Sequence, residues 1–269
     1  MKTLVLANQK GGVGKSAVAS LLTYYFVQHG QRVLAIDLDH QGNFTKPITL
    51  SKRGVVAAVT SEQVFLASDL TLPKERLVIV PAGDGLLLLE RQEAMHTPFA
   101  RAFRTFLKQV DADFDVCVVD TNPSPEIRLI SALASADFVL SPIQLNQESV
   151  DGVRALLLHP RVGVLKIKAL LNQKLNFIGL LPTMVESTNF QKDILVTLLE
   201  RHPNLMIKMA SGSQLARIPK RTAIAEAQSE GLVLWDVKRP TARAAWEEIK
   251  PSIEHIAGIV TAAEAAHAL

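Results

Sequence analysis

A glycine-rich loop between an apolar strand and a helix is the strongest constraint that the sequence places on the fold. Residues 4–7 are continuously apolar, and residues 10–16 read Lys-Gly-Gly-Val-Gly-Lys-Ser. Apolar positions then recur with helical spacing at Val18, Leu21, Leu22, Tyr25 and Phe26. The unpaired N–H groups of a helix start attract anions, and glycines let the backbone close around phosphate oxygens. The sequence therefore predicts a phosphate-binding loop at a helix N-terminus.

Two lysines lie on this loop. Lys15 is expected to reach the β- and γ-phosphates of a nucleotide, and the hydroxyl of Ser16 is expected to bind Mg²⁺. The generic pattern has a glycine five residues before Gly14, where this chain has Gln9, and a second lysine follows at Lys10. The residues expected to contact the nucleotide are Gly11, Gly12, Val13, Gly14, Lys15, Ser16 and Ala17. The alternative is a plain glycine-rich turn, which the order of strand, loop, Lys-Ser pair and helix disfavours.

The composition is that of an ordinary globular protein. The chain has 269 residues, of which 48% are hydrophobic, and a net charge of +3. No apolar run approaches the roughly 18–20 residues that cross a bilayer. The apolar start is cut short by polar residues 8–10, so it does not read as a signal peptide. We therefore expect a cytoplasmic protein.

The chain has a single cysteine, Cys117, which lies within an apolar strand. One cysteine cannot form an internal disulfide, and it argues against an iron–sulfur cluster, which needs several thiolates. We expect Cys117 to pack in the core.

Near-continuous apolar runs alternate with helical sequence along the chain. The predicted strands span residues 4–7, 32–37, 77–81, 115–120, 137–141 and 176–181. Residues 44–75 are weakly patterned and predict short helices and loops, and residues 85–110 predict a helix broken at Pro98. This alternation indicates an α/β fold of the P-loop NTPase type, a mostly parallel twisted sheet with helices on both faces. No linker divides residues 1–269, so we expect a single domain.

An acid ends the predicted strand at residues 115–120. Asp120 has the properties of a Walker B carboxylate, which holds Mg²⁺ directly or through water. The alternative is that Asp120 caps a following helix, together with Thr121, Asn122 or Ser124.

Several motifs together resemble the ParA/MinD group of ATPases, whose deviant Walker A loop carries a signature lysine. They are the loop at residues 8–16, Asp-Leu-Asp-His-Gln-Gly-Asn at 37–43, the Asp120 strand, residues 180–184, and residues 218–221 leading to 226–227. The chain is most similar in these motifs to ParA-type partition ATPases. It departs from them at His40, Asn122 and Gln228, where the family commonly has proline.

The resemblance implies roles for individual residues. Lys10 would cross the interface of an ATP-dependent homodimer to the partner's nucleotide, and Asp39 would orient the hydrolytic water. Asp37 would support the water shell of the metal, and Met184 and Pro219 would flank the adenine ring. The alternative for Asp39 is that it only caps a turn with Asn43. We interpret His40 as a loop replacement rather than a catalytic base.

The same resemblance implies a DNA-segregation function with a ParB-type partner that stimulates hydrolysis. Candidate contacts for non-specific DNA binding are Arg217, Lys220, Arg221, Lys238, Arg239 and Arg243. A solvated basic face is the alternative. The first strand begins within a few residues of the start, so we expect no helix-turn-helix module before the loop and no sequence-specific binding. Nucleoid association follows from this hypothesis.

Two other functions stay open. A MinD-like ATPase that cycles on a membrane needs a basic amphipathic helix. The last part of the chain has an apolar stripe at Trp246, Ile249, Ile253, Ile256 and Val260, but no lysine or arginine follows Lys250. We therefore expect this helix to pack on the core, without a membrane partner. The motifs also allow a nucleotide switch that positions a protein complex without DNA.

Overall fold

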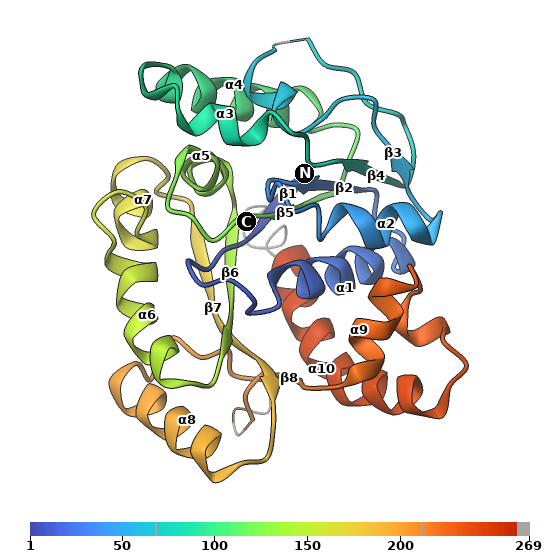
Figure 1. Ribbon diagram of the computed structural model, residues 1–269, viewed down its shortest axis with the longest axis vertical. Coiled ribbons are helices and arrows are strands. Elements are labelled where there is room, and N and C mark those ends of the chain that lie inside the picture. The colour runs from blue at the N-terminus through green and yellow to red at the C-terminus, as the bar shows by residue number, and fades with distance from the viewer. Residues whose placement is uncertain (68, 211, 213, 263–269) are drawn as a thin grey trace.

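Parallel strands form one sheet at the centre of the molecule (Figure 1). The computed structural model describes residues 1–67, 69–210, 212 and 214–262. Within them the sheet has eight strands in the order β3-β4-β2-β5-β1-β6-β7-β8, and each neighbouring pair is parallel. The strands are β1 Lys2–Leu6, β2 Val33–Asp37, β3 Val55–Val56, β4 Leu77–Val80, β5 Val116–Asp120, β6 Phe138–Gln144, β7 Asn176–Val185 and β8 Ile218–Pro219. The six predicted strands and their parallel arrangement are confirmed.

Helices cover both faces of this sheet. The α-helices are α1 Lys15–Gln28, α2 Thr45–Ser51, α3 Leu86–Glu90, α4 His96–Gln109, α5 Ile127–Ser135, α6 Gln147–Leu158, α7 Val164–Leu170, α8 Asn189–Arg201, α9 Thr222–Ser229 and α10 Pro240–Ala262. Short 3₁₀ turns are η1 Gln63–Phe65, η2 Glu93–Met95 and η3 Leu234–Asp236. Helices α1, α9 and α10 lie on one side of the sheet, and α3, α4 and α5 lie on the other (Figure 1).

Alternate residues of each central strand pack on opposite helix layers. In β1, Leu4 and Leu6 belong to the cluster that includes α1 and α10, whereas Val5 packs in the cluster with Phe99 and Phe103 of α4. Because both faces are covered, every side chain of such a strand can be apolar, which is why these strands read as continuous apolar runs.

Two details of the predicted helices were wrong. The helix predicted over 85–110 is interrupted between Glu90 and His96, and Pro98 lies in the first turn of α4. A proline is tolerated there because its missing N–H would have no partner inside the helix. In α1 it is Tyr24 that is buried, while Tyr25 is half-buried and stacks on His29.

The carboxyl ends of three central strands lie at the same level. In the sheet register Leu6 of β1 pairs with Asp120 of β5, which also pairs with Asp37 of β2. The phosphate-loop residues follow β1 directly. Open α/β sheets bind their ligands beyond these carboxyl ends, so the register brings the predicted site residues to one edge.

Helix α10 packs on the core as predicted. All five stripe residues, Trp246, Ile249, Ile253, Ile256 and Val260, are buried. Across the described parts of the chain, none of the helices combines the length and apolarity needed to span a bilayer.

The expected core position of Cys117 is confirmed. Its thiol is buried, and this burial raises its pKa well above the ordinary range. A thiol held in the protonated form is unreactive, which agrees with a packing role.

We predict that Ile253→Ala lowers the free energy of unfolding by about 2–5 kcal/mol, because it opens a cavity under a fully buried side chain. Urea unfolding followed by circular dichroism measures the change. The matched control is Glu247→Ala on the exposed side of the same helix, expected within about 0.5 kcal/mol of the wild type. Equal losses in the two variants would contradict the packing of α10.

Candidate nucleotide-binding site

The loop between β1 and α1 has the backbone of an anion cradle. Gly12 and Gly14 have φ of 73° and 82°, in the left-handed region that favours glycine. Gly14 is the N-cap of α1, and the first turn of α1 has neither a side-chain cap nor an acid. The N–H groups of this turn are therefore free of side-chain caps, and the helix dipole adds to their attraction for an anion.

Lys15 lies under this loop rather than on the surface. Its residue is only 6% exposed, and Nζ donates to the carbonyl oxygen of Lys10 at 3.3 Å. Burial lowers the pKa of Lys15, while the charges of Asp120 and Asp39 oppose that shift. The neighbouring carboxylates favour the charged form of this lysine. Because the ammonium group is poorly hydrated, its attraction for phosphate oxygens is stronger than it would be in water.

The carboxylate of Asp120 is buried and lacks hydrogen bonds. Neither oxygen accepts one from the described residues, although the hydroxyl of Ser16 lies near enough to favour the charged form. Burial, followed by the charge of Asp37, raises the pKa of Asp120 to about 8. The structure places the start of α5 at Ile127, so Asp120 does not cap that helix.

Orphaned carboxylate oxygens next to a hydroxyl fit a hard cation such as Mg²⁺. The described residues hold no group of three histidine, cysteine or acidic side chains that would bind a metal by themselves. Mg²⁺ keeps several waters and is commonly bound by one or two protein ligands plus phosphate oxygens, so one carboxylate beside a hydroxyl is a suitable set of protein ligands.

Both oxygens of Asp37 are already engaged. Oδ1 accepts from the backbone N–H of Asp39 at 3.1 Å, and Oδ2 accepts from the N–H and the hydroxyl of Thr45 at 2.8 and 2.7 Å. Burial raises the pKa of Asp37 to about 6 against these hydrogen bonds. Asp37 therefore fixes the loop before α2, and its role in the water shell of a metal stays a prediction.

Asp39 takes part in a turn of the loop that follows β2. Its Oδ1 accepts from the N–H of Gln41 at 3.1 Å, and its carbonyl accepts from Gly42 at 2.9 Å. The ring of His40 is 3.5 Å from Oδ1 and is exposed to solvent. The turn-capping alternative thus accounts for one oxygen of Asp39. Its charge also opposes the lowering of the Lys15 pKa.

Lys10 contacts its own chain in this structure. Its Nζ donates to Oδ1 of Asn146 at 3.2 Å and pairs with Glu148 in the first turn of α6. The side chain of Lys10 is 30% exposed and that of Glu148 is 77% exposed. An ion pair this exposed contributes little stability and is easily exchanged for another anion.

The two predicted adenine contacts lie in one cavity. Met184 and Pro219 line a cavity of about 280 Å³ together with Gly14 and Ala17. Met184 has φ 51°, an uncommon conformation for a residue with a side chain. Such strain persists where the surroundings demand it, and it is common at ligand sites.

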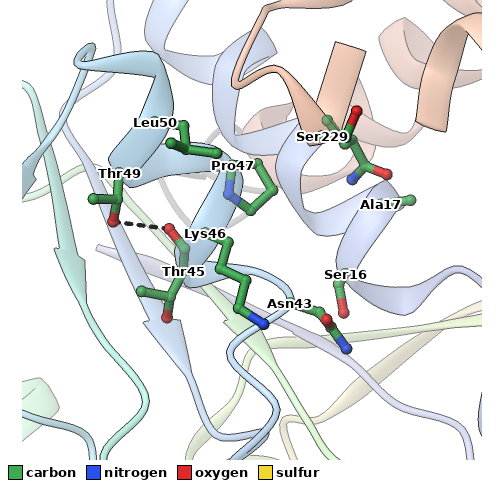
Figure 2. Close-up of a pocket in the computed structure, with 10 residues that line it drawn as sticks. Ser16, Ala17, Asn43, Thr45, Lys46, Pro47, Thr49, Leu50 and Ser229 are labelled. Atoms are coloured by element: carbon green, nitrogen blue, oxygen red, sulfur yellow. Dashed lines mark hydrogen bonds between the residues drawn. The ribbon is translucent and has the colours of Figure 1, made fainter. Parts of the chain in front are cut away.

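A second cavity, of about 650 Å³, adjoins the first along the start of α1. Figure 2 shows it between α1, α2 and Ser229 at the end of α9, with Ser16 and Ala17 on one wall. Ala17 and Gln228 line both cavities. The side chain of Lys46 extends toward Asn43 (Figure 2), so this space carries a positive charge on the side of the cavity opposite Ala17 and Ser229.

Sequence reasoning missed the residues that hold the loop in place. The hydroxyl of Thr183 lies 2.8 Å from the carbonyl oxygen of Val13 and 2.9 Å from that of Ile143. The amide of Gln144 donates to the carbonyl of Gly12 and to Sδ of Met184, each at 3.0 Å. A usable signal existed, because both side chains are polar residues that follow apolar residues near the carboxyl ends of their strands.

The predicted DNA contacts are partly neutralised by carboxylates. Lys220 pairs with Glu186 at 3.2 Å and Arg221 with Glu248 at 2.7 Å. Arg239 pairs with both Glu226 and Glu230. The three remaining candidates are exposed and have no ion pair within the described segments; they are Arg217, Lys238 and Arg243.

Known proteins match both the sequence and the fold. The AAA domain family AAA_31 matches residues 1–177. Protein IncC from Escherichia coli is 31% identical over 264 residues, 95% of this chain and 69% of the relative. The chromosome-partitioning ATPase Soj from Thermus thermophilus is 31% identical over 235 residues, 86% of each chain.

Solved structures share the architecture. An ATP complex of McdA from Cyanothece superposes with a TM-score of 0.72 at 21% identity, over 94% of this chain and 96% of that one. Cobyrinic acid a,c-diamide synthase from Mycobacterium smegmatis, with an ATP analogue and magnesium, gives 0.68 at 24% identity, over 93% of each. These likenesses confirm the P-loop NTPase fold expected from the sequence.

We predict that Asp120→Asn flattens the pH dependence of stability in metal-free buffer. Burial raises the pKa of Asp120 from 3.8 to about 8, so the folded state binds its proton more tightly than the unfolded state does. The stability that this proton confers is present at low pH and is lost as the pH rises from about 4 through about 8. The wild type should lose up to about 1.4 kcal/mol per pH unit more than the variant in this range.

Urea unfolding at pH 5 to 8.5 with a chelator measures the difference. Asp37 titrates in both proteins, so the difference between the two curves reports Asp120 together with its repulsion from Asp37. The exposed Asp84→Asn is the control and should behave as the wild type. Parallel curves for the wild type and Asp120→Asn would show that this carboxylate is not buried unpaired.

Proposed function

Because the chain belongs to the ParA-type partition ATPases, we propose that it hydrolyses ATP with Mg²⁺ as a dimer in a DNA-segregation cycle. The observation that carries this proposal is the arrangement at the carboxyl ends of β1, β5 and β2. The left-handed glycines, the buried Lys15 and the orphaned Asp120 meet there. Structural relatives solved with ATP, or with an ATP analogue and magnesium, support these cofactors.

The residues divide the work of phosphoryl transfer among them. The N–H groups at the start of α1 and the ammonium of Lys15 bind and orient the phosphates, and Asp39 orients the attacking water. Ser16 and Asp120 hold Mg²⁺, which when bound neutralises charge on the phosphate oxygens. Adenine lies in the cavity lined by Met184 and Pro219.

Dimerisation depends on Lys10 changing its partner. In the free protomer this lysine pairs with Glu148 and Asn146 on the exposed start of α6. Two protomers that meet at their phosphate loops exchange these contacts for the phosphate of the opposite nucleotide. The exposed ion pair is a weak competitor, because solvent screens it.

We predict different defects for the two lysine variants. Lys15→Ala should reduce ATP affinity at least about 100-fold, since it removes a buried charge from the phosphates. Lys10→Ala should keep affinity within about threefold but lose the ATP-dependent dimer and most turnover. Calorimetry measures binding, and light scattering measures the dimer. An ATP-dependent dimer of Lys10→Ala would remove the role of that lysine.

The proposed dimer binds DNA without sequence preference and is stimulated by a ParB-type partner on the nucleoid. The relatives that are chromosome-partitioning ATPases support this part of the proposal. Arg217, Lys238 and Arg243 are the best candidates for phosphate contacts, because their charge is not committed to a carboxylate in the described structure. Lys220, Arg221 and Arg239 must first leave their ion pairs.

Those same ion pairs favour a second candidate, an ATPase that positions a protein complex and does not bind DNA. The buried stripe of α10 leaves no apolar face in the described helix for a MinD-like membrane cycle. The two candidates differ in whether the ATP-bound dimer retains duplex DNA.

We predict that DNA affinity falls steeply with salt and is similar for unrelated sequences, because binding releases counterions from phosphates. Arg217→Ala with Arg243→Ala should reduce the slope of log K against log salt by about 2. Lys220→Ala with Arg221→Ala is the matched pair and should reduce it less. Fluorescence anisotropy with ATP and Mg²⁺ measures the slope. No binding at low salt would favour the second candidate.

A further inference from the structure

A buried arginine lies behind the acidic loop and has no part in the site described above. Arg128, in the first turn of α5, is 1% exposed. Its guanidinium donates in three directions: Nε to Glu90 at 2.8 Å, Nη2 to Glu126 at 3.1 Å, and Nη1 to the carbonyl oxygen of Leu38 at 3.0 Å. Leu38 separates Asp37 from Asp39.

The peptide groups of Leu38 are held from both sides. Its N–H donates to the carbonyl of Asp120 at 2.9 Å, and its carbonyl accepts from Arg128. These two contacts fix the backbone between the two acids. The orientation of that backbone sets the directions in which the carboxylates of Asp37 and Asp39 leave the chain.

Glu90 holds Arg128 in place. Its Oε1 pairs with the guanidinium, and its Oε2 accepts from the N–H of Ile127 at 2.8 Å at the start of α5. One carboxylate at the end of α3 thus fixes both the helix start and the arginine. Glu126 is 40% exposed and adds the third contact.

A need for packing does not explain this ion pair. Replacing a buried ion pair by apolar residues of similar volume is often neutral or stabilising. What an apolar residue cannot supply is a donor aimed at the carbonyl of Leu38. A lysine at the same position has a single point of charge in place of the planar fork, so it cannot make all three contacts in this geometry.

We propose that Arg128 is a positioning residue for hydrolysis, which orients Asp39 through the carbonyl of Leu38. The proposal rests on the proposed ATPase function. Arg128 does not contact the phosphate loop, so it acts on the water step and leaves nucleotide binding unchanged.

The experiment compares Arg128→Met and Arg128→Lys with the wild type. A misplaced carboxylate slows the chemical step, so single-turnover phosphate release should fall about 10- to 100-fold in Arg128→Met. Arg128→Lys should recover only part of this loss. Affinity for a non-hydrolysable ATP analogue should stay within about threefold, because the P-loop is intact. Arg128→Lys keeps the test valid if the methionine variant does not fold.

Two controls separate positioning from a loss of stability. Leu129→Ala removes a buried neighbour on α5, and Leu129 makes no hydrogen bond to the acidic loop in the described structure. If Leu129→Ala loses as much unfolding free energy as Arg128→Met, the Leu129→Ala variant should still hydrolyse ATP at the wild-type rate. In an Asp39→Ala background, Arg128→Met should slow turnover less than about twofold further, since the arginine acts through that carboxylate.

Each outcome decides the proposal. The positioning role would be overturned if the double variant of Asp39 and Arg128 slowed turnover by the product of the two single-variant factors. It would also be overturned if Leu129→Ala slowed turnover as much as Arg128→Met. The ATPase function would stand in both cases. A wild-type protein that releases no phosphate, or an Asp39→Ala variant as fast as the wild type, would instead overturn the proposed function and this inference with it.

Discussion

A carboxylate without a hydrogen-bond partner at the end of strand β5 is the constraint on which the candidate site depends. Asp120 lies between the ends of β1 and β2 because the strand order and register place it there. Its charge is unfavourable in the buried, free state, next to the second acid Asp37. Buried polar groups are nearly always paired, so an unpaired carboxylate at a strand end needs an explanation, and the proposed Mg²⁺ supplies one.

The parts of the fold that follow from local pattern were predictable from the sequence. Six strands were found because helices cover both faces of the sheet, which makes each strand continuously apolar. The phosphate loop was found because Gly12 and Gly14 occupy backbone conformations that other residues avoid. Strands β3 and β8 have two residues each, too few to show any period. The break was predicted at Pro98 but lies before α4, because proline is also favourable in the first turn of a helix.

Contacts between distant segments were not predictable. The candidate DNA contacts were chosen as basic residues of one stretch of sequence, whereas their partners Glu186 and Glu248 come from the β7–α8 connection and from α10. The hydrogen bonds from Thr45 to Asp37 depend on the path of the loop between β2 and α2. The ion pair of Arg128 with Glu90 joins residues 38 positions apart. None of these partners has a fixed spacing that a motif could record.

In the proposed dimer, the ion pair between Lys10 and Glu148 would make this lysine responsive to the charge of the opposite nucleotide. A single carboxylate holds the ammonium in the resting protomer. In the proposed dimer a terminal phosphate of higher charge displaces that carboxylate by simple counter-ion competition, whereas a shorter nucleotide leaves nothing within reach to displace it. Discrimination between triphosphate and diphosphate would then arise from one surface glutamate, and would need no moving lid.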